Sequence, residues 1–83
     1  MNYLNYSKGE RTRQKIYDYI VEYMTTKGYS PSVREICKAI GLKSTSSAYI
    51  HLSKLQKNGL ITTELDKPRT ISLVGYKLVK VDD

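Results

Sequence analysis

The feature that most constrains the fold is a pair of short helices predicted between Ser32 and Ile61. Ser32 and Glu35 form a Ser-x-x-Glu capping box, which is typical of a helix start. Apolar residues follow on one helical face: Ile36, Cys37 and Ile40. Gly41 comes next, and a glycine in the left-handed conformation at this place stops a helix. The stretch therefore predicts a helix, a tight turn and a second helix.

The second helix is predicted to open at Ser44, to run to Asn58 and to be ended by Gly59. Its inward stripe consists of Ala48, Leu52 and Leu55. The opposite face is left to solvent or to a ligand, and its side chains are short or planar enough to reach base edges in a DNA major groove. We predict these base contacts: Ser44, Thr45, Ser46, Ser47, Tyr49 and Ile50.

The charge around the two helices favours a polyanion. Acidic residues are absent between Ile36 and Thr63, whereas lysines occur throughout this stretch. The whole chain of 83 residues, enough for one small domain, has a net charge of +6. A basic surface alone is also compatible with a merely soluble protein, so the motif and the charge have to be taken together. We predict phosphate contacts from Lys38, Lys43 and Lys54.

A longer helix is predicted before the pair. Ser7 and Glu10 form one possible capping box, and Thr12 is an alternative start. The helix is predicted to end near Lys27, before Gly28. Its apolar face holds Ile16, Tyr19, Ile20, Tyr23 and Met24, so it is expected to be a scaffold that packs on the pair. Residues 1–6 show no period and are expected to form a flexible arm.

Beyond Gly59 the pattern changes from helical to strand-like. Residues 60–65 and 70–74 are short β-rich runs, and the charged segment 66–69 between them predicts a hairpin tip. Lys67 and Arg69 on this wing are predicted phosphate contacts, or else ordinary solubilising turn residues. Residues 75–83 are expected to form a third strand, a pairing edge for a dimer, or a tether. The predicted fold is mainly α with a small β-hairpin, a three-helix winged helix-turn-helix over residues 7–74.

Other classes of protein find little support. Catalysis needs a nucleophile and a base, or a metal cluster, and the chain has one histidine, His51, and one cysteine, Cys37, expected in the core. We therefore predict no enzyme activity, no cofactor and no metal. No apolar run of about 18 residues or signal-peptide core is present, so a cytoplasmic protein without a membrane anchor is expected. A winged helix that binds another protein remains the alternative to DNA binding.

Three blocks of the sequence resemble the amino-terminal DNA-binding domain of the LexA repressors, especially those of Gram-positive bacteria. The blocks are KGYSPSVREI at 27–36, GLKSTSSAYIHLSKLQKNGLI at 41–61 and DKPRTISL at 66–73. The resemblance implies a winged helix-turn-helix that binds palindromic operators as a homodimer and represses genes of the SOS response to DNA damage. The positions that match the base-contacting turn of the family are Ser44, Ser46, Ser47, Tyr49 and Ile50, and Lys67 and Arg69 match the wing.

The chain departs from that family in two ways. Tyr49 and Ile50 replace residues that are polar or very small in the relatives, so the operator sequence of the family is not carried over. The self-cleaving domain, with its Ser-Lys dyad and Ala-Gly cleavage dipeptide, is missing from this sequence. Two origins are compatible with this: a fragment of a longer repressor, or a small stand-alone regulator of phage or mobile-element type.

Overall fold

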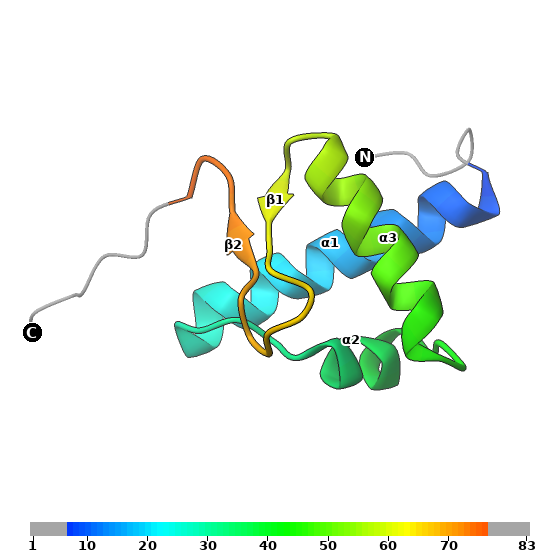
Figure 1. Ribbon diagram of the computed structural model, residues 1–83, viewed down its shortest axis with the longest axis horizontal. Helices are drawn as coiled ribbons and strands as arrows, with labels where there is room; N and C mark the ends of the chain where they lie inside the picture. The colour runs from blue at the N-terminus through cyan, green and yellow to red at the C-terminus, as the bar shows by residue number, and fades with distance from the viewer. Residues whose placement is uncertain (1–6, 77–83) are drawn as a thin grey trace, which may run out of the picture.

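The computed structural model describes residues 7–76 and contains the predicted elements in the predicted order (Figure 1). Three helices come first: α1 (Lys8–Lys27), α2 (Val33–Ile40) and α3 (Thr45–Lys57). An antiparallel hairpin of β1 (Ile61–Thr62) and β2 (Ser72–Leu73) follows them. The fold class is therefore confirmed. The predicted arm of residues 1–6 and positions 77–83 of the predicted tail lie outside the described residues.

Helix α1 begins at the first of its two predicted starts. The Ser7 hydroxyl accepts a hydrogen bond from the Glu10 N–H at 3.1 Å, and the Glu10 carboxylate accepts one from the Ser7 N–H at 3.4 Å. The alternative start at Thr12 is wrong, since this residue lies inside the helix and its hydroxyl donates to the Lys8 carbonyl at 3.0 Å. Gly28, with a φ of 80°, ends α1 as expected.

The two shorter helices form as their local signals predict. The Ser32–Glu35 capping box starts α2, and Gly41, with a φ of 85°, ends it. Helix α3 follows at once, with Ser44 as its extended N-cap residue. The Ser44 side chain makes no capping hydrogen bond, so it leaves the first amide groups of α3 without a side-chain acceptor at this position.

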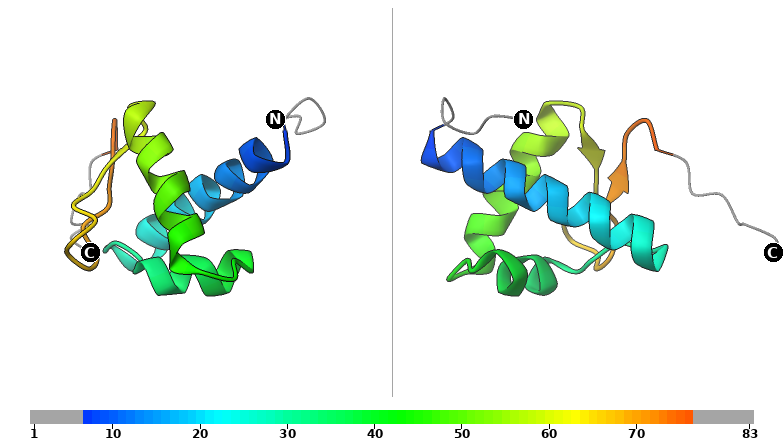
Figure 2. Two further views of the ribbon diagram at one scale, coloured as in Figure 1. Left: turned by 45° about the vertical axis from the view of Figure 1, so that its right-hand side comes forward. Right: turned by 180° about the vertical axis from the view of Figure 1, so that it is seen from behind.

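The core lies where the three helices and the hairpin meet. The helices pack against one another pairwise, with α3 crossing α1 and α2 running along one end, and β1 packs on α3 (Figures 1 and 2). The buried cluster draws side chains from every element and from the loop before β2: Ile16, Ile20, Met24, Ile36, Leu52, Leu55, Ile61, Ile71 and Leu73. The inward stripes predicted for the helices are thus confirmed, although Tyr19 and Ile40 are only partly buried.

The hairpin is shorter than predicted. The strands pair only as Ile61 with Leu73 and Thr62 with Ser72, and no strand forms at residues 63–65, 70–71 or 74. The Thr70 hydroxyl takes over the pairing there, because it accepts from the Glu64 N–H at 2.9 Å and donates to the Glu64 carbonyl at 2.8 Å. A side chain that satisfies both backbone groups of Glu64 replaces the next step of the ladder. The wing is consequently a loop over residues 63–71 rather than an extended ribbon.

Candidate nucleic-acid interface

The outward face of α3 is exposed in its first two turns. Leu52 and Leu55 are buried, and this inward stripe turns the remaining side chains of the helix away from the core. Ser44, Thr45 and Ser46 are exposed, and Ser47 is half-buried. Tyr49 and Ile50 are 37% and 57% exposed, a high value for large hydrophobic side chains. The six residues predicted as base contacts therefore gather around one accessible helix end.

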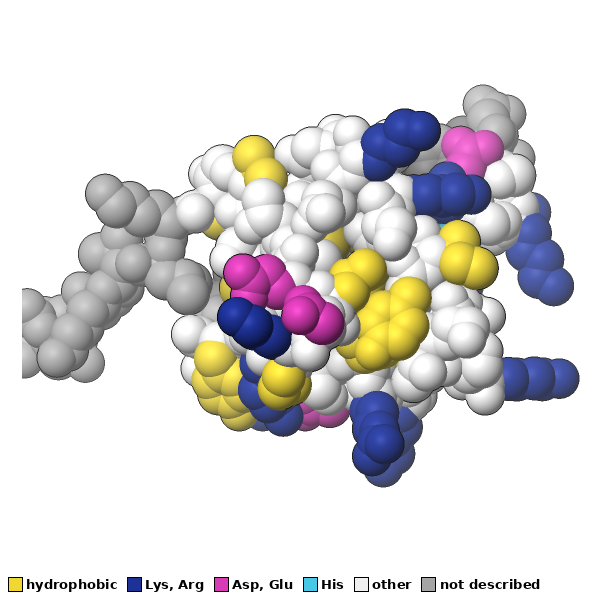
Figure 3. Space-filling view, in the orientation of Figure 1, with side chains coloured by type: hydrophobic (Ala, Val, Ile, Leu, Met, Phe, Trp, Pro, Cys, Tyr) yellow, Lys and Arg dark blue, Asp and Glu magenta, His cyan; other side chains and the backbone are white. Residues whose placement is uncertain are grey.

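A groove of about 360 Å³ lies between the start of α3, the start of α2 and the wing. It brings Thr45 and Tyr49 together with Lys67. The other predicted base contacts do not line it: Ser44, Ser46, Ser47 and Ile50. Its full lining is Ser32, Val33, Arg34, Thr45, Tyr49, Leu65, Asp66, Lys67 and Pro68. Hydrophobic side chains gather in the middle of this face of the molecule, Asp and Glu side chains lie beside them, and most Lys and Arg side chains lie around the rim (Figure 3).

Arg34 is a groove residue that the sequence analysis missed. Its side chain is exposed and comes from the first turn of α2, directly before the ion-pairing Glu35. The available signal was its place in the first turn of α2, off the apolar face that holds Ile36, Cys37 and Ile40. It adds a cation to the side of the groove opposite the wing.

The other predicted phosphate contacts surround the same helix pair. Lys38 lies in the last turn of α2, Lys43 in the turn, and Lys54 towards the end of α3. All three are exposed, and none forms an ion pair with another residue in 7–76. Their side chains are thus accessible to an anionic ligand.

The wing tip carries charges of both signs. The Lys67 ammonium lies 3.4 Å from the Glu64 carboxylate, and Asp66 is exposed next to it. An ion pair between two exposed side chains is worth about 0–1 kcal/mol, so it holds Lys67 only weakly. A phosphate can therefore displace the carboxylate from Lys67 at small cost.

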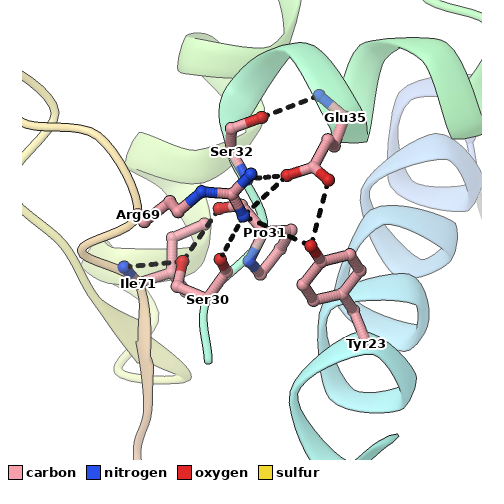
Figure 4. Close-up of polar contacts among 7 residues, drawn as sticks. All are labelled: Tyr23, Ser30, Pro31, Ser32, Glu35, Arg69 and Ile71. Carbon is pink, nitrogen blue, oxygen red and sulfur yellow. Dashed lines mark hydrogen bonds and ion pairs between the residues drawn. The ribbon is translucent and has the colours of Figure 1, made fainter. Parts of the chain in front are cut away.

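Arg69 does not line the groove; its side chain, 45% exposed, reaches the turn between α1 and α2. Its guanidinium Nη1 lies 2.8 Å from the Glu35 carboxylate and donates to the Ser30 carbonyl at 3.0 Å and to the Tyr23 hydroxyl at 3.2 Å (Figure 4). The phosphate contact predicted for Arg69 stays a prediction. The structure nevertheless gives this guanidinium three partners within the protein.

The surroundings of Glu35 hold its carboxyl in the charged form. Hydrogen bonds lower the pKa of Glu35 from 4.5 to about 2. The backbone N–H of Ser32 contributes most, and the side chains of Tyr23, Ser32 and Arg69 add to it. Burial raises the pKa of Tyr23, so its hydroxyl stays protonated and donates to Glu35 at 3.0 Å. Glu35 is thus an acceptor for α1, for its own helix and for the wing.

His51 and Cys37 occupy packing positions. The His51 ring lies against Arg13 of α1, whose Nη1 is 3.4 Å from Nδ1, and burial, followed by the charges of Arg13 and Lys54, lowers the pKa of His51. Cys37 is buried, and its thiol donates to the Ser44 carbonyl at 3.6 Å. Among residues 7–76, no group of three or more His, Cys, Asp or Glu side chains is placed to hold a metal ion. Within the same residues, no helix is long and apolar enough to cross a membrane.

Known proteins have sequences similar to most of this chain. The family profile described as the LexA DNA binding domain matches residues 9–70. The LexA repressor of Clostridium novyi is 55% identical over 65 residues, covering 78% of this chain and 32% of that protein. The LexA repressor of Staphylococcus epidermidis is 46% identical over 72 residues, covering 87% of this chain and 35% of that protein. The chain spans about a third of the length of these relatives. It belongs to the LexA DNA-binding domain family.

Proposed function

We propose that this chain binds double-stranded DNA in a sequence-specific manner, with the start of α3 in the major groove and the wing beside the sugar-phosphate backbone. The observation that carries the proposal is the exposed face of α3, which combines hydroxyl groups with Tyr49 and Ile50. Helix α3 contains no acidic residue, and exposed lysines lie before, within and after it. An acidic face would repel phosphate, whereas this one attracts it.

Position and sequence are read by different groups in this proposal. Lysine side chains and the amide end of α3 bind phosphates, which fix the domain on the duplex without regard to sequence. The Ser44 side chain does not occupy that amide end, so an anion can reach it. The hydroxyl groups of α3 and Tyr49 contact base edges, and Ile50 contacts a thymine methyl group.

The biological role follows from the named relatives. Proteins named LexA repressors contain the same domain. We therefore infer that this chain acts in a transcriptional repressor of the SOS response, which is encoded by a bacterium or a phage and works in the bacterial cytoplasm. A palindromic operator and a homodimer on DNA are part of this proposal, because a single small module gains affinity when two copies bind linked half-sites. The domain itself has no enzymatic role in this scheme.

Selection of bound sequences from a random duplex pool tests the proposal. Enrichment of a site with two-fold symmetry supports the repressor role, and enrichment of a single half-site supports DNA binding without pairing of protomers. A pool that stays random would refute sequence-specific binding. It would instead favour the protein-binding winged helix, which the exposed Tyr49 and Ile50 also suit.

The Tyr49→Phe variant is a matched control for the selection experiment. It keeps the ring and removes only the hydroxyl group, so it separates stacking or apolar contact from hydrogen bonding to a base. A preference that changes at one base position in this variant assigns the hydroxyl to that position. An unchanged preference assigns the contact to the ring.

A further inference from the structure

We propose that Arg69 is a positioning residue for DNA binding, which clamps the wing to the start of α2 and thereby sets where Lys67 stands relative to α3. The inference rests on the proposed function and assigns Arg69 a role different from that of a phosphate ligand. Three features carry it: the contacts of the guanidinium, the short hairpin ladder, and the backbone conformation of Arg69 itself.

The guanidinium joins elements that are far apart in the sequence. It binds the carboxylate of Glu35 on α2, the hydroxyl of Tyr23 on α1 and the carbonyl of Ser30 in the turn between these helices (Figure 4). It also lies over the Tyr29 ring, 5.4 Å from the centroid. All three polar contacts are made by the single nitrogen Nη1, while the guanidinium carbon lies over the Tyr29 ring. The planar fork of an arginine can bind acceptors and lie over a ring at the same time, whereas a lysine offers one point charge.

The hairpin ladder cannot by itself fix the wing tip. Two residue pairs form the ladder, and the loop 63–71 extends beyond them. The return arm of this loop is tied down at two neighbouring points: the Arg69 side chain, and the buried N–H of Ile71, which donates to the Ser30 hydroxyl at 3.1 Å. Both points lie on the turn that leads into α2. The wing is therefore located relative to α2 through Arg69 and Ile71.

The backbone at Arg69 indicates that its side chain is required. Its φ is 55°, and it is the only residue other than glycine with a positive φ among residues 7–76. Side chains other than glycine, asparagine and aspartate rarely adopt this conformation, and it persists only where surrounding contacts enforce it. The residues immediately before Arg69, from Leu65 to Pro68, form the wing side of the groove. A change at Arg69 is thus transmitted directly to Lys67.

The two possible roles of Arg69, as a phosphate ligand or as a positioning residue, predict opposite effects of a substitution at Glu35 on DNA affinity. If Arg69 bound phosphate, removal of the Glu35 charge would release the guanidinium and strengthen DNA binding. If Arg69 positions the wing, the same change replaces its charged partner by a neutral amide, leaves only neutral acceptors for the guanidinium and weakens binding. The Glu35→Gln variant suits this comparison, because glutamine also completes a capping box at this position and so preserves the start of α2.

The experiment measures DNA affinity of the 83-residue chain by fluorescence anisotropy, on the best duplex from the selection described above. Glu35→Gln and Arg69→Ala are each expected to weaken binding about tenfold, and the double variant no further, because coupled residues are not additive. Asp66→Asn is the matched control: it removes one carboxylate beside the same groove without touching the clamp, and it is expected to strengthen binding. Thermal unfolding followed by circular dichroism verifies that each variant is folded under the binding conditions.

The variants Arg69→Lys and Arg69→Gly keep the proposal testable if the Arg69→Ala substitution unfolds the wing. Lysine keeps the charge but loses the fork, so it is expected to bind almost as weakly as the alanine variant. Glycine accepts the positive φ without strain but cannot clamp, so it is also expected to bind weakly. Binding by Glu35→Gln at least as tight as that by Asp66→Asn, or near-normal binding by Arg69→Lys, would overturn the positioning role while leaving DNA binding intact. Failure of the wild-type chain to select any duplex would overturn both proposals.

Discussion

The salt dependence of DNA binding tests the electrostatic part of the interface quantitatively. Four exposed lysines around the helix pair and wing are the predicted phosphate contacts, namely Lys38, Lys43, Lys54 and Lys67. Arg69 is left out of this count because its guanidinium is bound to Glu35. Each neutralised phosphate contributes about −0.9 to the slope of log K against log salt, so a slope of about −3.6 per protomer is expected. Raising the salt from about 50 to about 200 mM should then weaken binding about 150-fold.

The assay is a titration by fluorescence anisotropy at several salt concentrations, on a duplex that holds one half-site. Lys43→Gln is expected to reduce the steepness of the slope by about 0.9. Lys27→Gln is the control, because Lys27 lies in the last turn of α1, over the Tyr23 ring, and is not one of the predicted phosphate contacts. A slope near zero would refute the phosphate contacts. Equal effects of the two substitutions would refute the assignment of those contacts to this face.

Four further outcomes are expected. Tyr49→Ala should change preference at one base position by about 1–3 kcal/mol, measured by repeating the selection; a uniform loss on all duplexes would contradict a role in base recognition. Gly41→Ala should cost about 1–2 kcal/mol in a urea titration because its φ is 85°, whereas Gly9→Ala inside α1 should gain about 0.5 kcal/mol. Leu52→Ala should cost about 3 kcal/mol in the same assay, because it empties a fully buried position. The folded-state pKa of Glu35 is depressed from 4.5 to about 2, so its contribution is complete above pH 4.5 and is lost as the pH falls towards 2; Glu35→Gln should flatten this acid limb of the stability profile.

The helices could be predicted from the sequence because their boundaries depend on neighbouring residues. The capping boxes at Ser7 and Ser32 and the stops at Gly28 and Gly41 each involve side chains or backbone groups within a single turn. The core positions followed from helical spacing for the same reason. Only the choice between the starts at Ser7 and Thr12 required the structure.

The wing could be predicted only in outline, because its details depend on contacts between distant residues. No local pattern shows that the Thr70 hydroxyl replaces a ladder step at Glu64, which shortens both strands. Likewise, the charged tip suggested that Lys67 and Arg69 are equivalent, whereas the structure separates them. Lys67 lines the groove, and Arg69 binds a carboxylate on another element. A basic residue in a turn has the same sequence signature in either role.

Glu35 connects α2, whose start depends on neighbouring residues, with the wing, whose position depends on contacts between distant residues. A carboxylate next to a predicted phosphate-binding surface opposes DNA binding by its charge, so its presence calls for a compensating benefit. Glu35 provides two: it completes the cap of α2 and it anchors Arg69, whose positive charge neutralises it. Since one side chain serves both the start of α2 and the wing, the two walls of the groove are fixed relative to each other. With the proposed clamp, the distance between Lys67 and the face of α3 would be set in the folded domain before DNA is bound, and the duplex would not have to order the wing.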